Sequence, residues 1–230
     1  MMCVSRLPKI EGGIKNMKKS IVLIFIVCLY SISFAAHPLT TDDIETVEVG
    51  KYELEFGYDN CKAGDESRNH SCGLCLKQGI TEKMDIGISL PYQIEPKSEE
   101  RLGKVTLGLK FLLIKDLIAF SINNELGSKE YFINGIVSKE ISPVTAHFNL
   151  GYKATGDENV KGKIIFSFAF EYPIEKIDLV GETIGEEIGF LNYLLGIRYK
   201  IIETIFVDLA YGNSFRKSDE KISFGFHIEL

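Results

Sequence analysis

Apolar and polar residues alternate along most of the chain from residue 51 onward. This period of two is typical of β-strands whose two faces meet different surroundings. In the first clear case Tyr52, Leu54, Phe56 and Tyr58 share one face. The pattern predicts twelve strands: 51–58, 74–80, 84–92, 105–111, 118–124, 131–137, 144–152, 164–172, 177–183, 191–199, 205–211 and 222–230.

Helical spacing is not found over any useful length of the mature chain. No apolar set recurs at i, i+3, i+4 and i+7 behind a capping residue. We therefore predict an all-β chain. Alternation alone fits either a soluble periplasmic sandwich or a membrane barrel, because both have one apolar and one polar face.

The tyrosines favour the membrane barrel. All nine that follow residue 36 fall on the apolar face, mostly near strand ends, and the chain has no Trp. Tyr at these places puts its ring among lipid headgroups and its hydroxyl in water, as in the aromatic girdles of outer-membrane barrels.

The connections and the last strand favour the same fold. Short links are expected at 81–83, 115–116, 140–143, 173–176 and 200–203, and longer polar ones at 59–71, 95–102, 154–163 and 213–220. The link near Gly127 is a short exception. Short turns at one end and longer loops at the other are typical of such barrels. The final strand ends on Leu230, the kind of apolar end that the barrel-insertion machinery reads. The prediction is a transmembrane antiparallel up-and-down β-barrel of about 12 strands, a closed form with no exposed edge.

The N-terminal region predicts export. A basic start at 17–19, an apolar run at 21–30 and small residues up to Ala35 have the form of a signal peptide spanning residues 17–35. Residues 1–16 fit no export pattern and are interpreted as an untranslated or non-structural extension, with Met17 as the true start. Residues 36–50 then form an N-terminal periplasmic or lumen segment before a barrel at 51–230. Localisation in the outer membrane follows.

Charge excludes one class of partner. The chain has 26 basic and 32 acidic residues, a formal net charge of −6, and no basic cluster beyond its N-terminus. Nucleic-acid binding relies on such clusters to contact phosphates, so we expect no nucleic-acid partner. The expected partners are outer-membrane lipid, the insertion machinery and a small solute.

The start of the mature chain carries a resemblance to a known family. His37-Pro38-Leu39-Thr40-Thr41-Asp42-Asp43, followed by Gly50-Lys51-Tyr52-Glu53-Leu54-Glu55, resembles the opening of the bacterial barrel family named for the meta-pathway (MetA-pathway) of phenol degradation. The segments 79–87, 90–92 and 108–111 agree with it. The resemblance implies an outer-membrane barrel that passes small aromatic or hydrophobic compounds.

The polar face of the strands supplies the candidate functional residues. If it lines the lumen, the lining residues are Lys51, Glu53, Glu55, Asp85, Lys110, Glu125, Lys153, Glu171, Glu182, Arg198, Asp208, His227 and Glu229. Two interpretations stay open. The set forms a narrow, acid-biased pore, or its charges pair across the lumen and close it, since buried charges are usually paired. Residues 42–50 could also fold into the lumen as a plug.

Cysteine and histidine offer two further chemistries. We expect a disulfide of unknown pairing among Cys61, Cys72 and Cys75, because exported proteins reach an oxidising compartment in which thiols form disulfides. A zinc site of these cysteines with His70 is the alternative. His147 with Asn149 could belong to a phospholipase-like hydrolase, which also needs a Ser nucleophile.

The prediction for function is a pore for passive transport of small solutes rather than an enzyme, and it requires no cofactor. The alternatives are an outer-membrane hydrolase and a structural barrel without transport.

Overall fold

A computed structural model describes residues 37–64, 68–97, 99–217 and 219–230. The predicted extension 1–16 and signal peptide 17–35 lie outside these residues. Among the described residues, no helix is long and apolar enough to cross a membrane. The twelve strands are β1 (Tyr52–Ala63), β2 (Asn69–Thr81), β3 (Met84–Glu95), β4 (Thr106–Ile114), β5 (Ile118–Glu125), β6 (Tyr131–Ile141), β7 (Val144–Ala154), β8 (Lys163–Ile174), β9 (Ile177–Glu186), β10 (Gly189–Ile202), β11 (Ile205–Ser214) and β12 (Asp219–Glu229).

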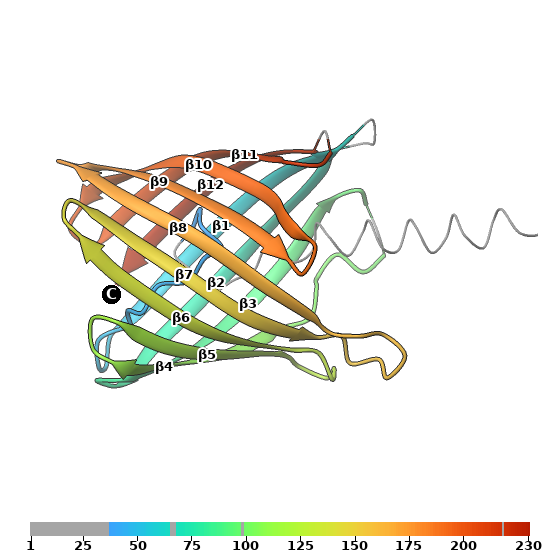
Figure 1. The fold of residues 1–230 in the computed structure, drawn as a ribbon, viewed down its shortest axis with the longest axis horizontal. Helices are drawn as coiled ribbons and strands as arrows, with labels where there is room; N and C mark the ends of the chain where they lie inside the picture. Colours follow the sequence, from blue (N-terminus) through green and yellow to red (C-terminus); the bar gives the residue numbers. More distant parts are fainter. Residues whose placement is uncertain (1–36, 65–67, 98, 218) are drawn as a thin grey trace, which may run out of the picture. The chain divides into compact units, whose positions relative to one another are not determined.

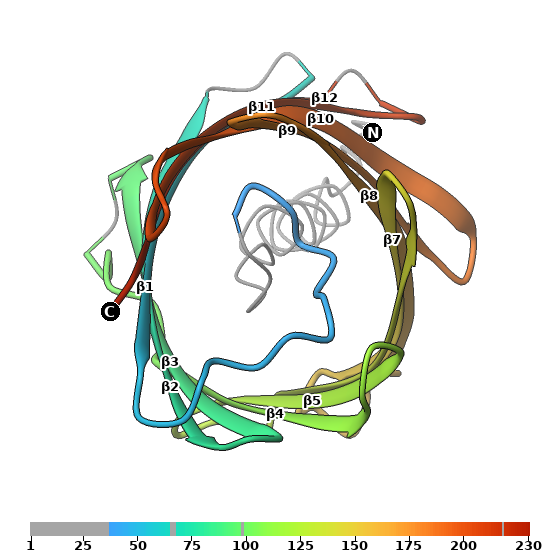
Figure 2. The ribbon, with the colours of Figure 1, turned by 90° about the vertical axis from the view of Figure 1, so that its left-hand side faces the viewer.

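The strands form one closed antiparallel barrel in which each pairs with its neighbours in sequence (Figure 1). Closure is made by β1 and β12, where Gly57 lies opposite Gly225 and Glu55 opposite His227. The end-on view in Figure 2 shows the ring of strands. Because the last strand pairs with the first, the sheet has no free edge, which a strand in lipid could not satisfy. The predicted fold class is confirmed.

Strand ends differ from the sequence prediction. All twelve predicted strands are present, but β1 runs on to Ala63 and β2 begins at Asn69, so the predicted 59–71 connection shrinks to 64–68. The predicted 213–220 connection likewise shrinks to 215–218. Both links remain longer than the turns at the other end of the barrel, as predicted, but their bounds were predicted too wide. At the end of a barrel both strand faces can meet water, so the alternation fades before the strand stops.

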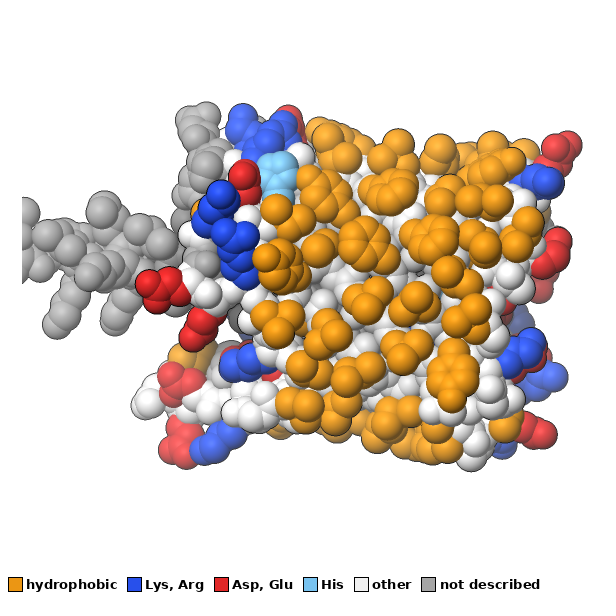
Figure 3. Space-filling view, turned by 180° about the vertical axis from the view of Figure 1, so that it is seen from behind, with side chains coloured by type: hydrophobic (Ala, Val, Ile, Leu, Met, Phe, Trp, Pro, Cys, Tyr) orange, Lys and Arg blue, Asp and Glu red, His pale blue; other side chains and the backbone are white. Residues whose placement is uncertain are grey.

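The outer surface is apolar. Leu195 and Leu209 are 57% and 52% exposed on outward strand positions, and Figure 3 shows apolar side chains covering the wall on the side in view, with charges near its two ends. Of the nine tyrosines, seven are exposed by 38% or more. Tyr131 and Tyr152 are neighbours near one end of the barrel, while Tyr52 begins β1 at the other. Inward positions are polar, with Ser89 and Ser223 fully buried. This distribution suits lipid outside and a polar lumen inside.

Candidate functional site

Residues 37–50, called the plug from here on, cross the interior of the barrel (Figure 2, blue). The plug joins the wall at β2, where Val49 forms a parallel bridge with Gly79 and the Gly50 N–H donates to the Gly79 carbonyl at 2.9 Å. A Cβ at Gly79 would lie 2.1 Å from the Glu48 carbonyl oxygen. Only glycine permits this approach. Of the two locations that the sequence left open for this segment, the structure has the lumen.

The far end of the plug is held by a recess for His37. Nδ1 of His37 lies 2.5 Å from Oδ1 of Asp208, and Nε2 lies 2.9 Å from Oγ of Ser223. The imidazole fills the space left by two facing glycines, since a Cβ at Gly57 would lie 2.7 Å, and one at Gly225 2.1 Å, from ring atoms of His37. The recess therefore fits an imidazole in both shape and hydrogen bonding.

Arg198 fixes the plug backbone beside this recess. Its Nη2 donates to the His37 carbonyl at 3.3 Å, and its Nη1 lies 3.2 Å from Oε1 of Glu171. Leu39 of the plug packs into a small apolar cluster on the wall, formed by Ala169, Val180, Leu194 and Ala210. Polar and apolar contacts together define the course of this part of the plug.

Glu182 of β9 binds the middle of the plug. Its carboxylate accepts hydrogen bonds from the backbone N–H and the hydroxyl of both Thr40 and Thr41, at 2.8–2.9 Å. Glu182 is only 7% exposed. Four donors from two consecutive residues satisfy a buried carboxylate, and two of them require a hydroxyl side chain at both positions.

Lys110 of β4 binds the next residues. Its Nζ lies 2.7 Å from Asp42 Oδ1 and 3.4 Å from Asp43 Oδ1, and it donates to the Glu45 carbonyl at 2.8 Å. Ile44 packs against Ala119 and Ile136 of the wall. The plug is therefore bound both by β9 and by β4, on separate arcs of the barrel.

Two carboxyl groups of the plug titrate differently. Burial raises the pKa of Asp43, but Lys110 and Lys77, together with smaller contributions from His147 and the Glu45 N–H, hold that pKa below its ordinary value. The negative charge of Asp43, and then burial, raise the pKa of Glu45. Asp43 thus contributes its carboxylate to the surroundings of Lys110, beside that of Asp42, whereas Glu45 contributes its backbone carbonyl to the same ammonium.

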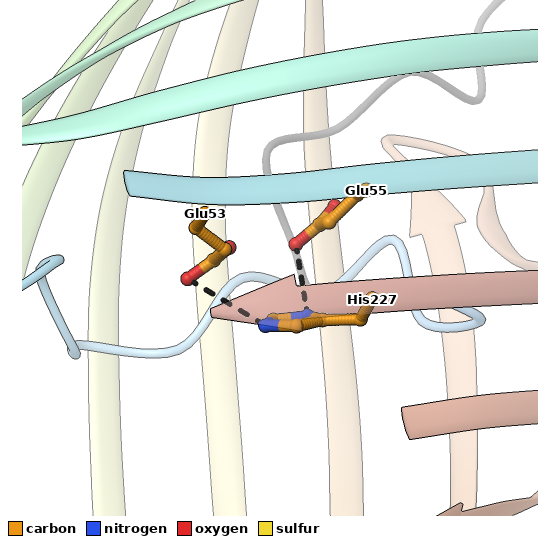
Figure 4. A group of neighbouring side chains, drawn as sticks. All are labelled: Glu53, Glu55 and His227. Atoms are coloured by element: carbon orange, nitrogen blue, oxygen red, sulfur yellow. Dashed lines mark ion pairs between the residues drawn. The ribbon is translucent and has the colours of Figure 1, made fainter. Parts of the chain in front are cut away.

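A second charged group lies where β1, β2 and β12 meet. Lys77 Nζ is 2.6 Å from Glu53 Oε1 and 2.9 Å from Glu55 Oε1. His227 approaches the same carboxylates at 4.0 and 3.7 Å (Figure 4). The ligand atoms of Glu53, Glu55 and His227 lie within 4.8 Å of one another, which a metal ion could use. The Lys77 ammonium already pairs with both carboxylates, so we interpret the group as an ion-pair network.

The structure places most of the predicted lumen residues on inward positions within the barrel: Glu53, Glu55, Asp85, Lys110, Lys153, Glu171, Glu182, Arg198, Asp208 and His227. Lys51, Glu125 and Glu229 lie at the rims, where their side chains are 56%, 32% and 50% exposed. Lys77 was not among the predicted lumen residues, although its position on the polar face of 74–80 was a sufficient signal. It also missed that Asp85 accepts the Val47 N–H at 3.1 Å.

The disulfide predicted among Cys61, Cys72 and Cys75 is not formed between any two of them in the described part of the chain. Cys72 and Cys75 are three positions apart on β2, so their side chains point to opposite faces. Cys61 lies opposite Asn69, whereas Cys75 lies opposite Glu55, six residues along β1 from Cys61. That separation is about 20 Å at the usual strand rise, far beyond the reach of a disulfide or of a shared zinc ion.

His147 has a serine partner, but the pair is not an assembled hydrolase site. Ser138 Oγ lies 2.8 Å from His147 Nδ1, on register partners of β6 and β7. Within the described part of the chain, His147 Nε2 has no hydrogen-bond partner. A serine hydrolase needs a third group to orient the imidazole and donors for the oxyanion, and the paired backbone of these strands offers neither in this geometry.

Comparison with known proteins places the fold. No protein-family model and no curated protein matches the chain. Among solved structures, KdgM porin is similar with a TM-score of 0.57 and 8% identity, over 76% of this chain and 98% of that one. KdgM porin in complex with disordered oligogalacturonate gives 0.56 and 8% over the same shares. At this identity the similarity concerns the fold alone: the chain has the β-barrel fold of the outer-membrane porins.

Proposed function

We propose that this protein is an outer-membrane channel through which small solutes cross passively, down their own gradient. The observation that carries the proposal is the combination of an apolar outer wall with a lumen lined by charged and polar side chains. A barrel needs an apolar outer wall to lie in lipid, and it needs a polar lumen to admit a hydrated solute.

In our proposal the channel is closed while the plug lies in the lumen, as it does in this structure. It crosses the lumen and is bound at His37, Thr40, Thr41, Asp42 and Val47 by side chains of the wall. Apart from the apolar contacts of Leu39 and Ile44, these interactions are polar, and water or a solute can replace them. Opening of the channel therefore needs only the plug to move. The barrel wall keeps its shape, because all its strands remain paired through backbone hydrogen bonds.

Carboxylates outnumber cationic groups among the inward residues, and Asp42 and Asp43 of the plug add to them. A passage lined by fixed negative charge raises the local concentration of cations. We therefore expect the open channel to favour cations over anions.

The resemblance of 37–55 to the phenol-degradation barrel family supports transport in general terms, and we propose membership of that family. The segment that carries the resemblance includes the plug itself. The solute class implied by the family is aromatic or hydrophobic, whereas the polar lumen wall favours a solute that forms hydrogen bonds.

Planar-bilayer recording tests the proposal. Purified mature protein should give discrete ion currents, with a reversal potential in a KCl gradient that reports selectivity for K⁺. The Glu182→Ala variant, which loses four hydrogen bonds to the plug, should conduct for a larger fraction of the time. Silence of both proteins at all voltages would contradict a channel.

A further inference from the structure

One sector of the lumen wall is polar and carries no carboxylate, ammonium or guanidinium group. We call it the amide–hydroxyl band; its residues occupy inward positions on β5, β6 and β7, and they are Ser121, Asn123, Asn134, Ser138, His147 and Asn149. Cross-strand pairing makes them neighbours, since Ser121 lies opposite Asn134 and Ser138 opposite His147. Charged residues such as Lys110 border the band.

Several polar atoms of the band have no partner. Ser121 Oγ, Asn134 Oδ1 and His147 Nε2 are fully covered and form no hydrogen bond within the described part of the protein. Their residues are only 2%, 3% and 7% exposed. Buried polar groups are nearly always paired, and an unpaired one costs free energy. Three such atoms on adjoining strands indicate a surface built to meet a ligand.

The plug shows how the band holds a neighbouring donor and acceptor. The Asn149 amide accepts from the Asp42 N–H at 2.8 Å and donates to the Asp42 carbonyl at 2.7 Å. Asn134 Nδ2 donates to the same Asn149 oxygen at 3.0 Å. Adjacent hydroxyl groups of a polyol offer the same pair, one donating and one accepting.

We propose that the amide–hydroxyl band is the solute-binding surface of the channel and that its ligands are small uncharged polyols and saccharides. This inference rests on the proposed channel function and deepens it. An ion would lose its hydration at a wall without a counter-charge. An apolar aromatic solute would leave the donors and acceptors of the band unpaired. A site built for hydrogen bonds binds such a solute much more weakly.

Solute binding and plug release are coupled in this arrangement. Asp42 occupies Asn149, and Ile44 lies against Ala119 and Ile136 beside the Ser121–Asn134 pair. A polyol that bonds to Asn149 takes the place of the Asp42 backbone. The solute therefore favours the open state because it binds only when the plug has left the band.

The test uses the mature protein in proteoliposomes, with xylitol and sucrose as uncharged probes, gluconate as the anion and catechol as the aromatic compound. The band variant is Ser121→Ala with Asn134→Leu, which removes hydrogen bonding at similar size. The matched control is Ser89→Ala, because Ser89 Oγ is also buried without a partner but lies on β3, outside the band. K⁺ conductance is recorded for all three proteins.

Xylitol influx should saturate with concentration and fall about tenfold in the band variant, the effect of losing two hydrogen bonds of ordinary strength. It should be unchanged in Ser89→Ala, and xylitol influx in each protein is compared relative to the K⁺ conductance of the same protein. Xylitol influx that does not saturate, or that is equal in the band variant, would overturn the inference and leave the band as a hydrated wall. Saturable flux of gluconate or catechol in its place would overturn it too.

Absence of K⁺ conductance from all three proteins would instead count against the proposed channel. In that case, calorimetric titration of the detergent-solubilised proteins with xylitol decides the inference. Binding by the wild type and by Ser89→Ala, lost in the band variant, supports the site, and absence of binding by the wild type overturns it. Heat-modifiable gel migration shows that the variants are folded.

Discussion

Thr41 donates two hydrogen bonds to Glu182, from its backbone N at 2.8 Å and its hydroxyl at 2.9 Å, both to Oε2. Thr40 adds two more to the same carboxylate. Glu182 is a charged residue of the lumen, of the kind that sets solute selectivity in a pore. Its hydrogen bonds are thus taken up by the plug. In the proposed channel, control of access and lining of the lumen are therefore properties of the same side chains.

Replacement of Glu182 by Ala should loosen the plug. Hydrogen bonds to a charged group contribute about 1.5–3 kcal/mol each before water replaces them, so we expect an increase of tenfold or more in the open-to-closed ratio. Single-channel recording measures that ratio. The control is Glu186→Ala, since Glu186 pairs with Lys163 at 3.1 Å near the end of β9 and forms no ion pair with the described residues of the plug. An unchanged ratio in Glu182→Ala would show that the plug does not gate the current.

Gly79→Ala should displace the plug at its attachment to β2. The added Cβ would meet the Glu48 and Val47 carbonyl oxygens at 2.1 and 2.3 Å, and backbone atoms cannot yield as a flexible side chain can. The displaced plug should be cut faster after Glu45 by a glutamate-specific protease, as followed by mass spectrometry.

The control for that experiment is Gly135→Ala, where the added Cβ would meet only the Leu150 carbonyl at an ordinary 3.7 Å. Equal cleavage rates in the two variants would argue against the close packing of the plug on β2.

The sequence predicted the barrel because lipid imposes a strict rule on the outer face. Leu209 and Tyr211 on β11, or Ile222 and Phe224 on β12, must alternate with inward residues as long as the strand is in the membrane. Past the membrane that rule no longer applies. This is why β1 could be predicted up to Tyr58 but not through Cys61 to Ala63.

The candidate site was only partly predictable. Alternation places Glu55 and His227 on the lumen face, but their contact follows from the closure of β1 on β12, which no local pattern encodes. The course of the plug was harder still. Residues 37–50 have no period, and their location is decided by partners such as Asp208, Glu182 and Lys110 on separate strands.

Lys77→Met should destabilise the barrel. Lys77 is 5% exposed and is paired with Glu53 and Glu55. Its loss leaves two carboxylates close together without their cation, and breaking such a buried pair costs about 3–5 kcal/mol. Urea unfolding in detergent micelles measures the loss of stability. It is followed by the intrinsic fluorescence of the tyrosines, since the chain has no Trp, or by gel migration.

Two companion variants make the Lys77 experiment specific. Adding Glu53→Gln and Glu55→Gln to Lys77→Met should recover most of the stability, because no unpaired charge remains. Lys51→Met removes a lysine whose side chain is 56% exposed at the rim and should cause no measurable change. Failure of the triple variant to recover would indicate that packing around Lys77, rather than charge, is at stake.

A charge on the lipid face should cost most near mid-strand. Leu209 lies in the middle of β11 and is 52% exposed, while Ile141 ends β6 and is 66% exposed. Arginine costs about 2–4 kcal/mol at the midplane of the bilayer and about 0–1 kcal/mol near its surface. Leu209→Arg should therefore unfold at a clearly lower denaturant concentration in phospholipid vesicles than Ile141→Arg. In a soluble barrel both positions would face water and both substitutions would be nearly neutral, so equal and small effects would contradict a membrane location.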